Sequence, residues 1–364
     1  MALPLVRLEG TPYAQGYRHG AVLRERIVHN LAIYFERFAR EVNLSRVEVL
    51  ARAARYAEAI RQRNPDYYQA MEGVAAGAEL PFAEIVALNV RYELFYDGYV
   101  EKPYADGCTA FAVMPDASSD GQLWIGENWD WIVGVQGVVL HTIEPDGLET
   151  LAFSEAGIVG GKIGMNSAGI GLLINGLTSA VDDWSRLHAP FHLRCYEILR
   201  SQKFDAAVRI ITDEDRACST NYLIAQAPNK VVNIEAAPGG VGVTHCRDGC
   251  IVHANHFVDP VAIGIVERNV ETNPHSHWRQ RRLGELVAQP PLSVDTMRGA
   301  LRDHERHPYS VCFHIDPSEP PEEHYATLTS VIMNLHELRM EISDGPPCTE
   351  PYTTFRLRPE SDPG

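Results

Sequence analysis

The chain lacks several features that would place it in a large class of proteins. None of its apolar runs approaches the ~18 residues that cross a bilayer, so we expect no membrane span. Acidic residues outnumber basic ones, 48 against 32, and the formal net charge of −16 argues against a surface for nucleic acid or anionic lipid. No internal repeat is present, and 364 residues suit one large globular unit.

Cysteine is scarce, and its number is odd. An odd count in a large chain indicates reduced thiols rather than a disulfide framework. The first seven residues are too short for a secretory signal and contain a proline and an early arginine. We therefore expect a cytoplasmic protein. The seven cysteines are Cys108, Cys195, Cys218, Cys246, Cys250, Cys312 and Cys348.

Several familiar catalytic and cofactor motifs are also missing. The chain has no G-x-S-x-G elbow and no nucleotide-binding motif. The segment Cys246-x3-Cys250-x2-His253-x2-His256 offers four metal ligands, but its spacing is not that of a zinc finger or ribbon. If this segment alternates as a strand, His253 and His256 point to opposite faces. We expect no metal and no cofactor, and assign surface or structural roles to His275, His277, His304 and His307.

The most informative motif is Gly107-Cys108-Thr109, at the start of an apolar alternating run. A small residue before the thiol lets the backbone bend so that sulfur can attack the preceding carbonyl. Hydrolysis of the resulting thioester would free Cys108 with an α-amine, whose ordinary pKa is about 7.7–8.0, so this amine can serve as the base for its own thiol. The alternative is a buried core cysteine. We predict self-cleavage between Gly107 and Cys108, with Cys108 as the nucleophile.

Further short motifs follow one another from about Gly10 to the last forty residues. They are Gly10–Gly20, Pro65–Tyr68, Glu72-Gly73, Ala76–Ala78, Leu88–Glu93, Gly107–Thr109, Asn128–Asp130, Glu155–Gly157, Gly164–Gly169, His253–Phe257 and His307–Cys312. This ordered set resembles the acyl-coenzyme A:6-aminopenicillanate acyltransferase family, a self-cleaving branch of the N-terminal nucleophile (Ntn) hydrolases. The resemblance covers nearly the whole chain and implies an α+β fold, a four-layer αββα sandwich.

The resemblance also implies roles for three polar residues. Asp130 would lie near the nucleophile and hold the terminal amine, and we favour this role over the alternative, an Asx turn capped by Asn128. Asn255 would be a catalytic amide that donates to the oxyanion or positions the amine, although an Asn at a strand end often only forms a turn. Asn175 would be an oxyanion or substrate donor, as in related bile-salt-hydrolase-type enzymes, although it could simply anchor a loop.

We place Trp131, Thr109 and Phe313 at the substrate. Phe313 marks a departure, because the penicillin acyltransferase has an arginine after its Ser-x-Cys run. A phenyl ring cannot replace a guanidinium electrostatically, so a β-lactam substrate is in doubt. Arg279 and Arg282 could clamp a substrate carboxylate, but we favour internal salt bridges for both.

Hydrophobic periodicity predicts a helical segment followed by a mixed region. Helices are expected over 12–42, 45–62, 65–79 and 81–96, then an exposed connector over 97–107 that suits cleavage. Strands are expected at 109–114, 122–127, 137–143, 149–154, 158–165, 169–174, 220–226, 231–236, 250–254, 326–334 and 337–342, with helices at 189–201, 204–212, 275–289 and 293–302. Residues 1–107 would become the small fragment and 108–364 the Ntn core, together forming one structural unit.

The expected function is hydrolysis of a small linear amide, of the N-acyl amine or N-acyl amino acid type, through a Cys108 thioester. One alternative is an acyltransferase that moves an acyl group from acyl-coenzyme A or an amide to an amine. A second is a catalytically silent scaffold. The expected partners are the small-molecule amide and the two fragments with each other, with a homo-oligomer possible; nucleic acid and membranes are not expected. The substrate and the oligomeric state stay open.

Overall fold

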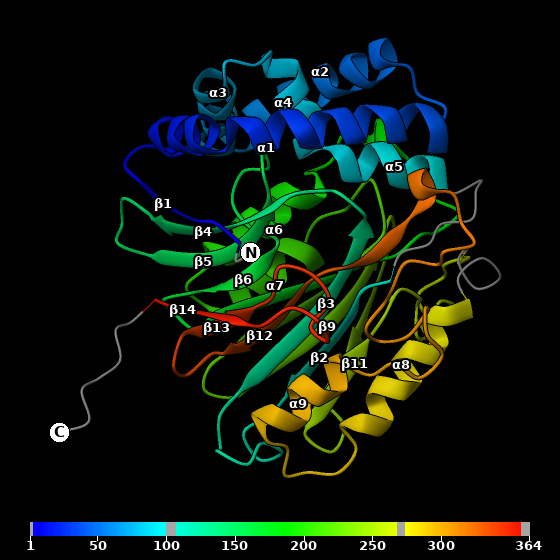
Figure 1. Ribbon diagram of the computed structural model, residues 1–364. Coiled ribbons are helices and arrows are strands. Elements are labelled where there is room, and N and C mark those ends of the chain that lie inside the picture. Colours follow the sequence, from blue (N-terminus) through cyan, green and yellow to red (C-terminus); the bar gives the residue numbers. More distant parts are fainter. Residues whose placement is uncertain (1–2, 100–106, 268–273, 358–364) are drawn as a thin grey trace.

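Two β-sheets stacked face to face form the centre of the molecule (Figure 1). The computed structural model describes residues 3–99, 107–267 and 274–357. One sheet has eight strands in the order β1 (Leu5–Glu9), β4 (Gly137–Ile143), β5 (Glu149–Glu155), β6 (Ile163–Asn166), β7 (Ile170–Gly176), β8 (Thr220–Gln226), β9 (Lys230–Ala237) and β10 (Gly240–Thr244). The other has six, in the order β11 (Cys250–His253), β2 (Thr109–Val113), β3 (Trp124–Ile132), β12 (Tyr325–Asn334), β13 (Arg339–Ile342) and β14 (Thr353–Arg356).

Helices cover the outer faces of both sheets. Against the eight-stranded sheet pack α6 (Phe191–Leu199) and α7 (Phe204–Thr212), which contact β7, β8 and β9. Against the six-stranded sheet pack α8 (Pro274–Leu286) and α9 (Val294–Leu301), below the sheets in Figure 1. The layer order is therefore αββα, which confirms the predicted α+β sandwich.

The N-terminal helices form a further layer along the top of the sandwich in Figure 1. They are α1 (Pro12–Glu41), α2 (Arg46–Arg63), α3 (Pro65–Ala78), α4 (Phe82–Asn89) and α5 (Arg91–Tyr99). Thr11 caps α1, and Pro12 occupies its first turn. The backbones of α1 and α3 are in close contact at Gly16. A Cβ placed on Gly16 would overlap the carbonyl oxygen of Ala70, so a larger residue would force the two helices apart.

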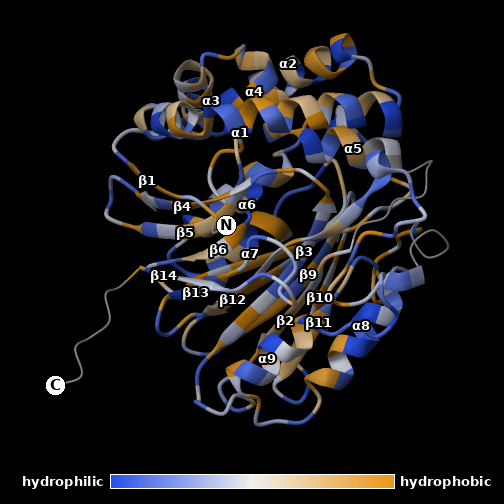
Figure 2. Ribbon diagram, in the orientation of Figure 1, coloured by the Kyte–Doolittle hydropathy of each residue, from blue (hydrophilic) through white to orange (hydrophobic). Residues whose placement is uncertain are grey.

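Strand β2 demonstrates how the sandwich is built. Ala110 and Ala112 belong to the large core between the sheets, whereas Phe111 and Val113 pack with Leu283 of α8. Successive side chains of a strand point to opposite faces, so both faces of β2 are buried. Figure 2 shows the resulting mixture of apolar and polar residues along these central strands.

Several predicted boundaries were wrong. The N-terminal segment is not wholly helical, since β1 pairs in parallel with β4, and the helix expected over 81–96 is interrupted at Val90. The alternative of a turn at Asn128-x-Asp130 does not hold, because both residues lie inside β3, which continues to Ile132. Strands β10 and β14 were not predicted, and β6 begins only at Ile163.

Most of the predicted connector, residues 100–106, lies outside the described residues. Within the described ranges, no helix has the length and apolar character that a bilayer crossing requires.

Candidate active site

The predicted cleavage junction lies at the entry to β2. Cys108 is only 1% exposed, and the next residue, Thr109, pairs with Asn128 of β3. Because β3 runs on past Asn128, it passes directly beside the junction. The Cys108 Sγ lies 3.8 Å from the carbonyl oxygen of Asp130. The thiol and the predicted acidic residue are therefore neighbours on two paired strands.

The carboxylate of Asp130 packs against Gly107. A Cβ on Gly107 would overlap Asp130 Oδ2, so at this position only glycine fits without a shift. Asp130 is fully buried, and its Oδ1 accepts a hydrogen bond from Thr327 Oγ1 at 2.6 Å. The backbone N–H of Phe313 donates to the same Thr327 oxygen at 2.9 Å. A short chain of hydrogen bonds therefore fixes the acid beside the junction.

Arg279 of α8 holds the junction from the other side. Its buried Nη1 donates to the carbonyl oxygen of Gly107, to that of Cys108 at 2.8 Å and to Thr109 Oγ1 at 2.7 Å. Its Nη2 donates to Asn255 Oδ1 at 3.0 Å. A guanidinium on a carbonyl oxygen is well suited to stabilise negative charge that develops there.

The two arginines of α8 have different surroundings. Arg282 forms the predicted salt bridge, with Asp303 at 2.7 Å. Arg279 instead contacts backbone carbonyls, a hydroxyl and an amide at the junction. Sequence reasoning missed this role, because helical spacing does not reveal which loop a helix faces.

Asn255 and Asn175 lie in neighbouring parts of one buried polar network. Asn255 Nδ2 donates to the carbonyl of Gly176 at 3.2 Å, one residue beyond Asn175. Asn175 Oδ1 accepts from Asn221 Nδ2 at 2.9 Å and lies 3.2 Å from His253 Nδ1. Within the described ranges, the buried Asn175 Nδ2 has no hydrogen-bond partner. A buried donor left in this state is suited to a bound oxygen atom.

His253 belongs to this network, although the sequence did not mark it as functional. Its Nε2 lies 2.8 Å from Glu235 Oε1. The predicted opposition of His253 and His256 was wrong, because β11 ends at His253 and the chain then turns. The two imidazole rings lie 6.3 Å apart and nearly parallel, at 16°.

The thiol itself faces a narrow pocket between the sheets. Cys108 lines it together with Trp129, Trp131 and Lys162. The cavity volume of about 10 Å³ has room for about one water molecule. Trp131 thus lies beside the candidate nucleophile, and its contact with a substrate stays a prediction. Phe313 and Thr109 do not line this pocket and instead contact the network around Asp130 and Gly107.

Part of the wall of this pocket is a buried ionic cluster that the sequence did not predict. Glu155 pairs with both Arg91 and Lys162, and Lys162 Nζ lies 3.2 Å from the centroid of Trp129. Burial lowers the pKa of Lys162 to about 8. Burial opposes ionisation of Glu155, but Arg91 and Lys162 outweigh it and hold the pKa of this carboxyl below its usual range. The cluster places a titratable cation at the pocket wall.

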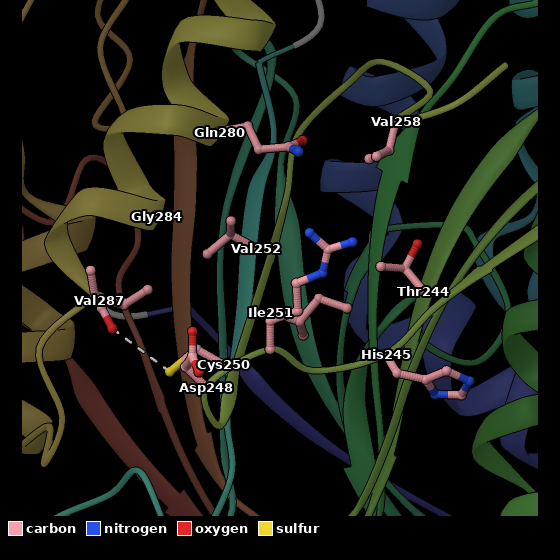
Figure 3. Close-up of a pocket in the computed structure, with 12 residues that line it drawn as sticks. Thr244, His245, Asp248, Cys250, Ile251, Val252, Val258, Gln280, Gly284 and Val287 are labelled. Atoms are coloured by element: carbon pink, nitrogen blue, oxygen red, sulfur yellow. Dashed lines mark hydrogen bonds between the residues drawn. The ribbon is translucent and has the colours of Figure 1, made fainter.

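A separate cavity of about 370 Å³ lies between β11, the end of β10 and α8 (Figure 3). Val252, Gln280 and Gly284 contribute to its wall, and Cys250 Sγ contacts the carbonyl of Val287 at 3.7 Å. Its volume is in the range of small-molecule sites. The described residues lining it do not include Cys108, so it is distinct from the pocket at the thiol.

Comparison with known proteins identifies the family of this four-layer αββα protein. The sequence model of the acyl-coenzyme A:6-aminopenicillanic acid acyl-transferase family matches residues 117–347. This is well over half of the chain, so the protein belongs to that family, a family of enzymes. The match includes Asp130, Asn175 and Asn255 but begins after Cys108.

Individual relatives are more distant. The chain is 27% identical over 321 residues, 84% of each chain, to the acyl-coenzyme A:6-aminopenicillanic-acid-acyltransferase 40 kDa form of Emericella nidulans. It is 22% identical over 412 residues to an uncharacterized protein of Archaeoglobus fulgidus, covering 99% of this chain and 66% of that protein.

Solved structures that resemble the chain do so weakly. One is the N-acylethanolamine-hydrolyzing acid amidase ortholog of Caenorhabditis elegans, with a TM-score of 0.47, 12% identity and coverage of 69% of this chain and 100% of that chain. Another is penicillin V acylase from Agrobacterium tumefaciens, with a TM-score of 0.47, 14% identity and coverage of 69% and 86%.

Proposed function

We propose that this chain cleaves itself between Gly107 and Cys108 and then hydrolyses a small linear amide through a thioester on Cys108. The substrate would be an N-acyl amine or an N-acyl amino acid. The observation that carries the proposal is the buried guanidinium of Arg279 on the carbonyl oxygen of Gly107, with the Cys108 thiol and the Asp130 carboxylate beside the same peptide bond.

In the self-cleavage step, Cys108 Sγ loses its proton and attacks the carbonyl carbon of Gly107. Arg279 stabilises the oxyanion that forms. The C–N bond then breaks, the nitrogen of Cys108 takes up the proton that the thiol released, and the Gly107 acyl group remains on sulfur as a thioester. Water hydrolyses this thioester to the carboxylate of Gly107 and the free thiol. The buried carboxylate of Asp130 is suited to hold the new ammonium group.

In each later turnover, the α-amine of Cys108 accepts the thiol proton and passes it to the leaving amine of the substrate. The unpartnered Nδ2 of Asn175 supports a role as an oxyanion donor. Asn255 accepts from Arg279, which supports a role in holding this guanidinium and the nearby backbone. Water resolves the acyl-enzyme. The narrow pocket beside Cys108 must widen for a substrate, and we propose that cleavage at Gly107 allows this.

The fragments 1–107 and 108–364 would remain associated after cleavage. Strand β1 belongs to the first fragment but pairs with β4 of the second. The core cluster that contains Ile27 and Leu31 of α1 also contains residues of both sheets. Separation would expose this apolar surface to water, which opposes dissociation.

A second candidate is acyl transfer to an amine, supported by family membership and by the named relative from Emericella nidulans. Hydrolysis and transfer share the acyl-enzyme and differ in whether water or an amine resolves it. We favour hydrolysis because it needs no second binding site.

The test is incubation with a panel of linear amides, with and without hydroxylamine or a free amine, using Cys108→Ala as the control. Our proposal predicts free acid as the main product and a hydroxamate when hydroxylamine intercepts the thioester. An acyl-amine as the main product at modest amine concentration would favour the transferase. Unreacted amides, together with a Cys108 that resists alkylation, would instead indicate a silent scaffold.

A further inference from the structure

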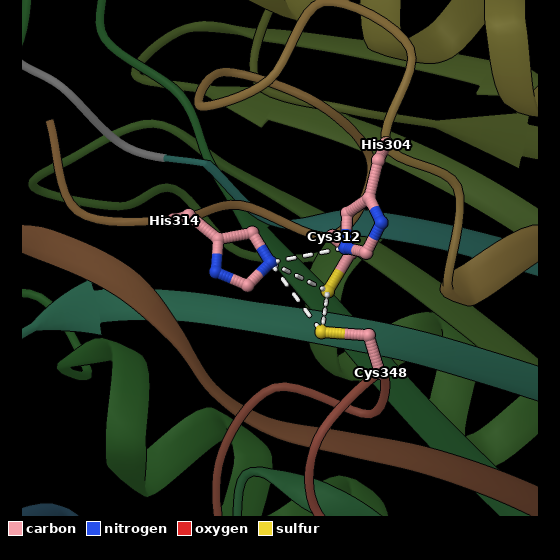
Figure 4. A group of neighbouring side chains, drawn as sticks. All are labelled: His304, Cys312, His314 and Cys348. Atoms are coloured by element: carbon pink, nitrogen blue, oxygen red, sulfur yellow. Dashed lines mark hydrogen bonds between the residues drawn. The ribbon is translucent and has the colours of Figure 1, made fainter.

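Two cysteines and two histidines from distant segments meet on the side of the six-stranded sheet where α9 packs (Figure 4). His304 follows α9, Cys312 and His314 lie in the loop before β12, and Cys348 follows β13. One ligand atom from each residue lies within 4.8 Å of every other. Cys312 is buried, His314 and Cys348 are half-buried, and His304 is exposed.

The spacing of these atoms approaches the edges of a metal tetrahedron. The two sulfurs lie 3.6 Å apart, His314 Nε2 lies 3.5 Å from each sulfur, and the two Nε2 atoms lie 3.1 Å apart. The distances from His304 to the two sulfurs are within 4.8 Å. Zinc bonds of about 2.3 Å to sulfur and about 2.0–2.1 Å to nitrogen imply edges of roughly 3.3–3.8 Å in a tetrahedral site, so the three distances that join the sulfurs and His314 fall in this range and the nitrogen–nitrogen distance is slightly shorter. A disulfide needs sulfurs about 2.05 Å apart, so this arrangement fits a shared cation better.

We propose that His304, Cys312, His314 and Cys348 bind a Zn²⁺ ion. Thiolate and imidazole ligands favour zinc over Mg²⁺ or Ca²⁺, which prefer oxygen. Two thiols would release their protons to solvent on binding, and the two thiolates would then balance the charge of the ion. Four protein ligands leave no open position, so the ion would be structural rather than catalytic.

The site would fix a loop that contacts the junction network. Phe313 stands between the ligands Cys312 and His314. Its N–H donates to Thr327 Oγ1 at 2.9 Å, and its carbonyl accepts from Thr327 N–H at 3.0 Å. Thr327 in turn donates to Asp130. An ion that ties this loop to the turn at Cys348 would therefore hold the support of Asp130 in place.

No local sequence pattern indicates this cluster. The spacing His304-x7-Cys312-x-His314-x33-Cys348 matches no common zinc motif, and we expected a surface or structural role for His304 and no metal. The ligands meet only because the α9–β12 loop and the turn after β13 pack together. The proposal thus revises the expectation that the chain has no metal.

The test is the metal content of the full-length protein, purified with reductant and without chelator, followed by titration of the stripped protein with Zn²⁺ and with Co²⁺. The variants are Cys348→Ser and, because its side chain is exposed and its loss should not impair folding, His304→Ala. The matched controls are Cys246→Ser, a half-buried thiol elsewhere, and His307→Ala, an exposed histidine of the same loop.

We expect one zinc per wild-type chain and per control chain, and a zinc affinity about 100-fold or more lower in Cys348→Ser and His304→Ala. Cobalt should give the intense visible bands of a tetrahedral site and a thiolate-to-metal charge-transfer band. A chelator should lower the Tm of the wild type by about 5 °C and leave that of Cys348→Ser unchanged.

Three results would overturn the proposal. The first is that the reduced wild-type protein takes up neither zinc nor tetrahedral cobalt. The second is that the two control variants lose the metal as completely as the ligand variants. The third is that the freshly purified protein is lighter by two hydrogens, with Cys312 and Cys348 joined by a disulfide in one peptide pair. None of these readouts depends on self-cleavage or on amide turnover.

Discussion

The two faces of β3 carry different kinds of side chain. Asn128 and Asp130 point toward α8 and α9, where Asn128 donates to the carbonyls of Leu301 and Val311. Trp129 and Trp131 point the other way, into the core between the sheets, and line the pocket at Cys108. The period of two along a strand thus separates polar groups that hold a backbone junction from aromatic groups that shape a cavity.

Under our proposal, the groups for self-cleavage and the groups that would contact the amide substrate therefore lie on opposite faces of β3. Arg279, which donates to the Gly107 carbonyl, and Asp130, whose carboxylate packs against Gly107, lie on the face toward α8. The groups that would meet a substrate lie on the face toward the eight-stranded sheet. Substitutions on one face should therefore affect self-cleavage and turnover unequally, whereas Cys108 serves both.

Cys108→Ala should have the largest effect, because it removes the proposed nucleophile of both reactions. We expect no self-cleavage and no amide turnover, as seen by gel electrophoresis and by product analysis. The fold should persist, since a buried thiol replaced by a methyl group changes little volume. A cleaved, active Cys108→Ala protein would contradict the mechanism.

Arg279→Met should come next, with self-cleavage slowed by about 10²–10³-fold, the cost of removing one strong oxyanion donor. The measurement is the rate of precursor loss. Arg282→Met is the control, since its partner Asp303 lies in a partly exposed salt bridge away from the junction. Equal rates in the two variants would show that the contact with the Gly107 carbonyl has no chemical role.

Gly107→Ala should slow self-cleavage by about 10–100-fold, because the new methyl group would displace the Asp130 carboxylate. Gly299→Ala is the control, since a Cβ there meets nothing within 4 Å. If Gly107→Ala matured at the wild-type rate, the packing of Asp130 against the junction would be irrelevant to cleavage.

Trp131→Phe tests the pocket face and should have a smaller effect. It removes the Nε1–H that donates to Tyr34 at 2.8 Å and slightly enlarges the pocket. The lost hydrogen bond should cost about 1 kcal/mol of protein stability, and the less firmly held ring should raise KM only a few-fold. Self-cleavage should stay within about twofold of wild type. A cleavage defect larger than the turnover defect would break the separation of the faces.

Acid should lower the free energy of unfolding through His19 of α1, a residue on neither face of β3. His19 is buried, and its Nε2 accepts the N–H of Gly157 at 3.0 Å, so burial lowers its pKa to about 4. The unfolded chain takes up this proton near pH 6.5 and the folded chain only near pH 4. Its contribution is therefore complete above pH 6.5 and is lost as the pH falls toward 4, by about 3 kcal/mol.

Denaturant unfolding from pH 7 to pH 4 measures this loss. His19→Gln should flatten the pH dependence relative to wild type, while its rates of cleavage and turnover at pH 7 remain close to normal. An unchanged pH dependence in the variant would show that His19 titrates similarly in the folded and unfolded chains.

The sequence predicted the parts of the molecule that depend on local pattern. The period of apolar residues located most helices, and the resemblance supplied the sandwich. The roles of Arg279 and Lys162 escaped prediction because a buried cation has no local signature; its role depends on which distant backbone or carboxylate it meets. The alternative of a turn at Asn128-x-Asp130 failed for a related reason, since burial on both faces outweighed the turn preference of Asn and Asp.

The most direct test of the central claim is the intact mass of freshly purified protein, with N-terminal sequencing of each component. We predict two chains that copurify, the larger beginning at Cys108 with the sequence Cys-Thr-Ala-Phe. A single full-length mass that persists on prolonged incubation would contradict self-cleavage at Gly107–Cys108, and a new terminus at any other residue would contradict the assignment of Cys108 as the nucleophile.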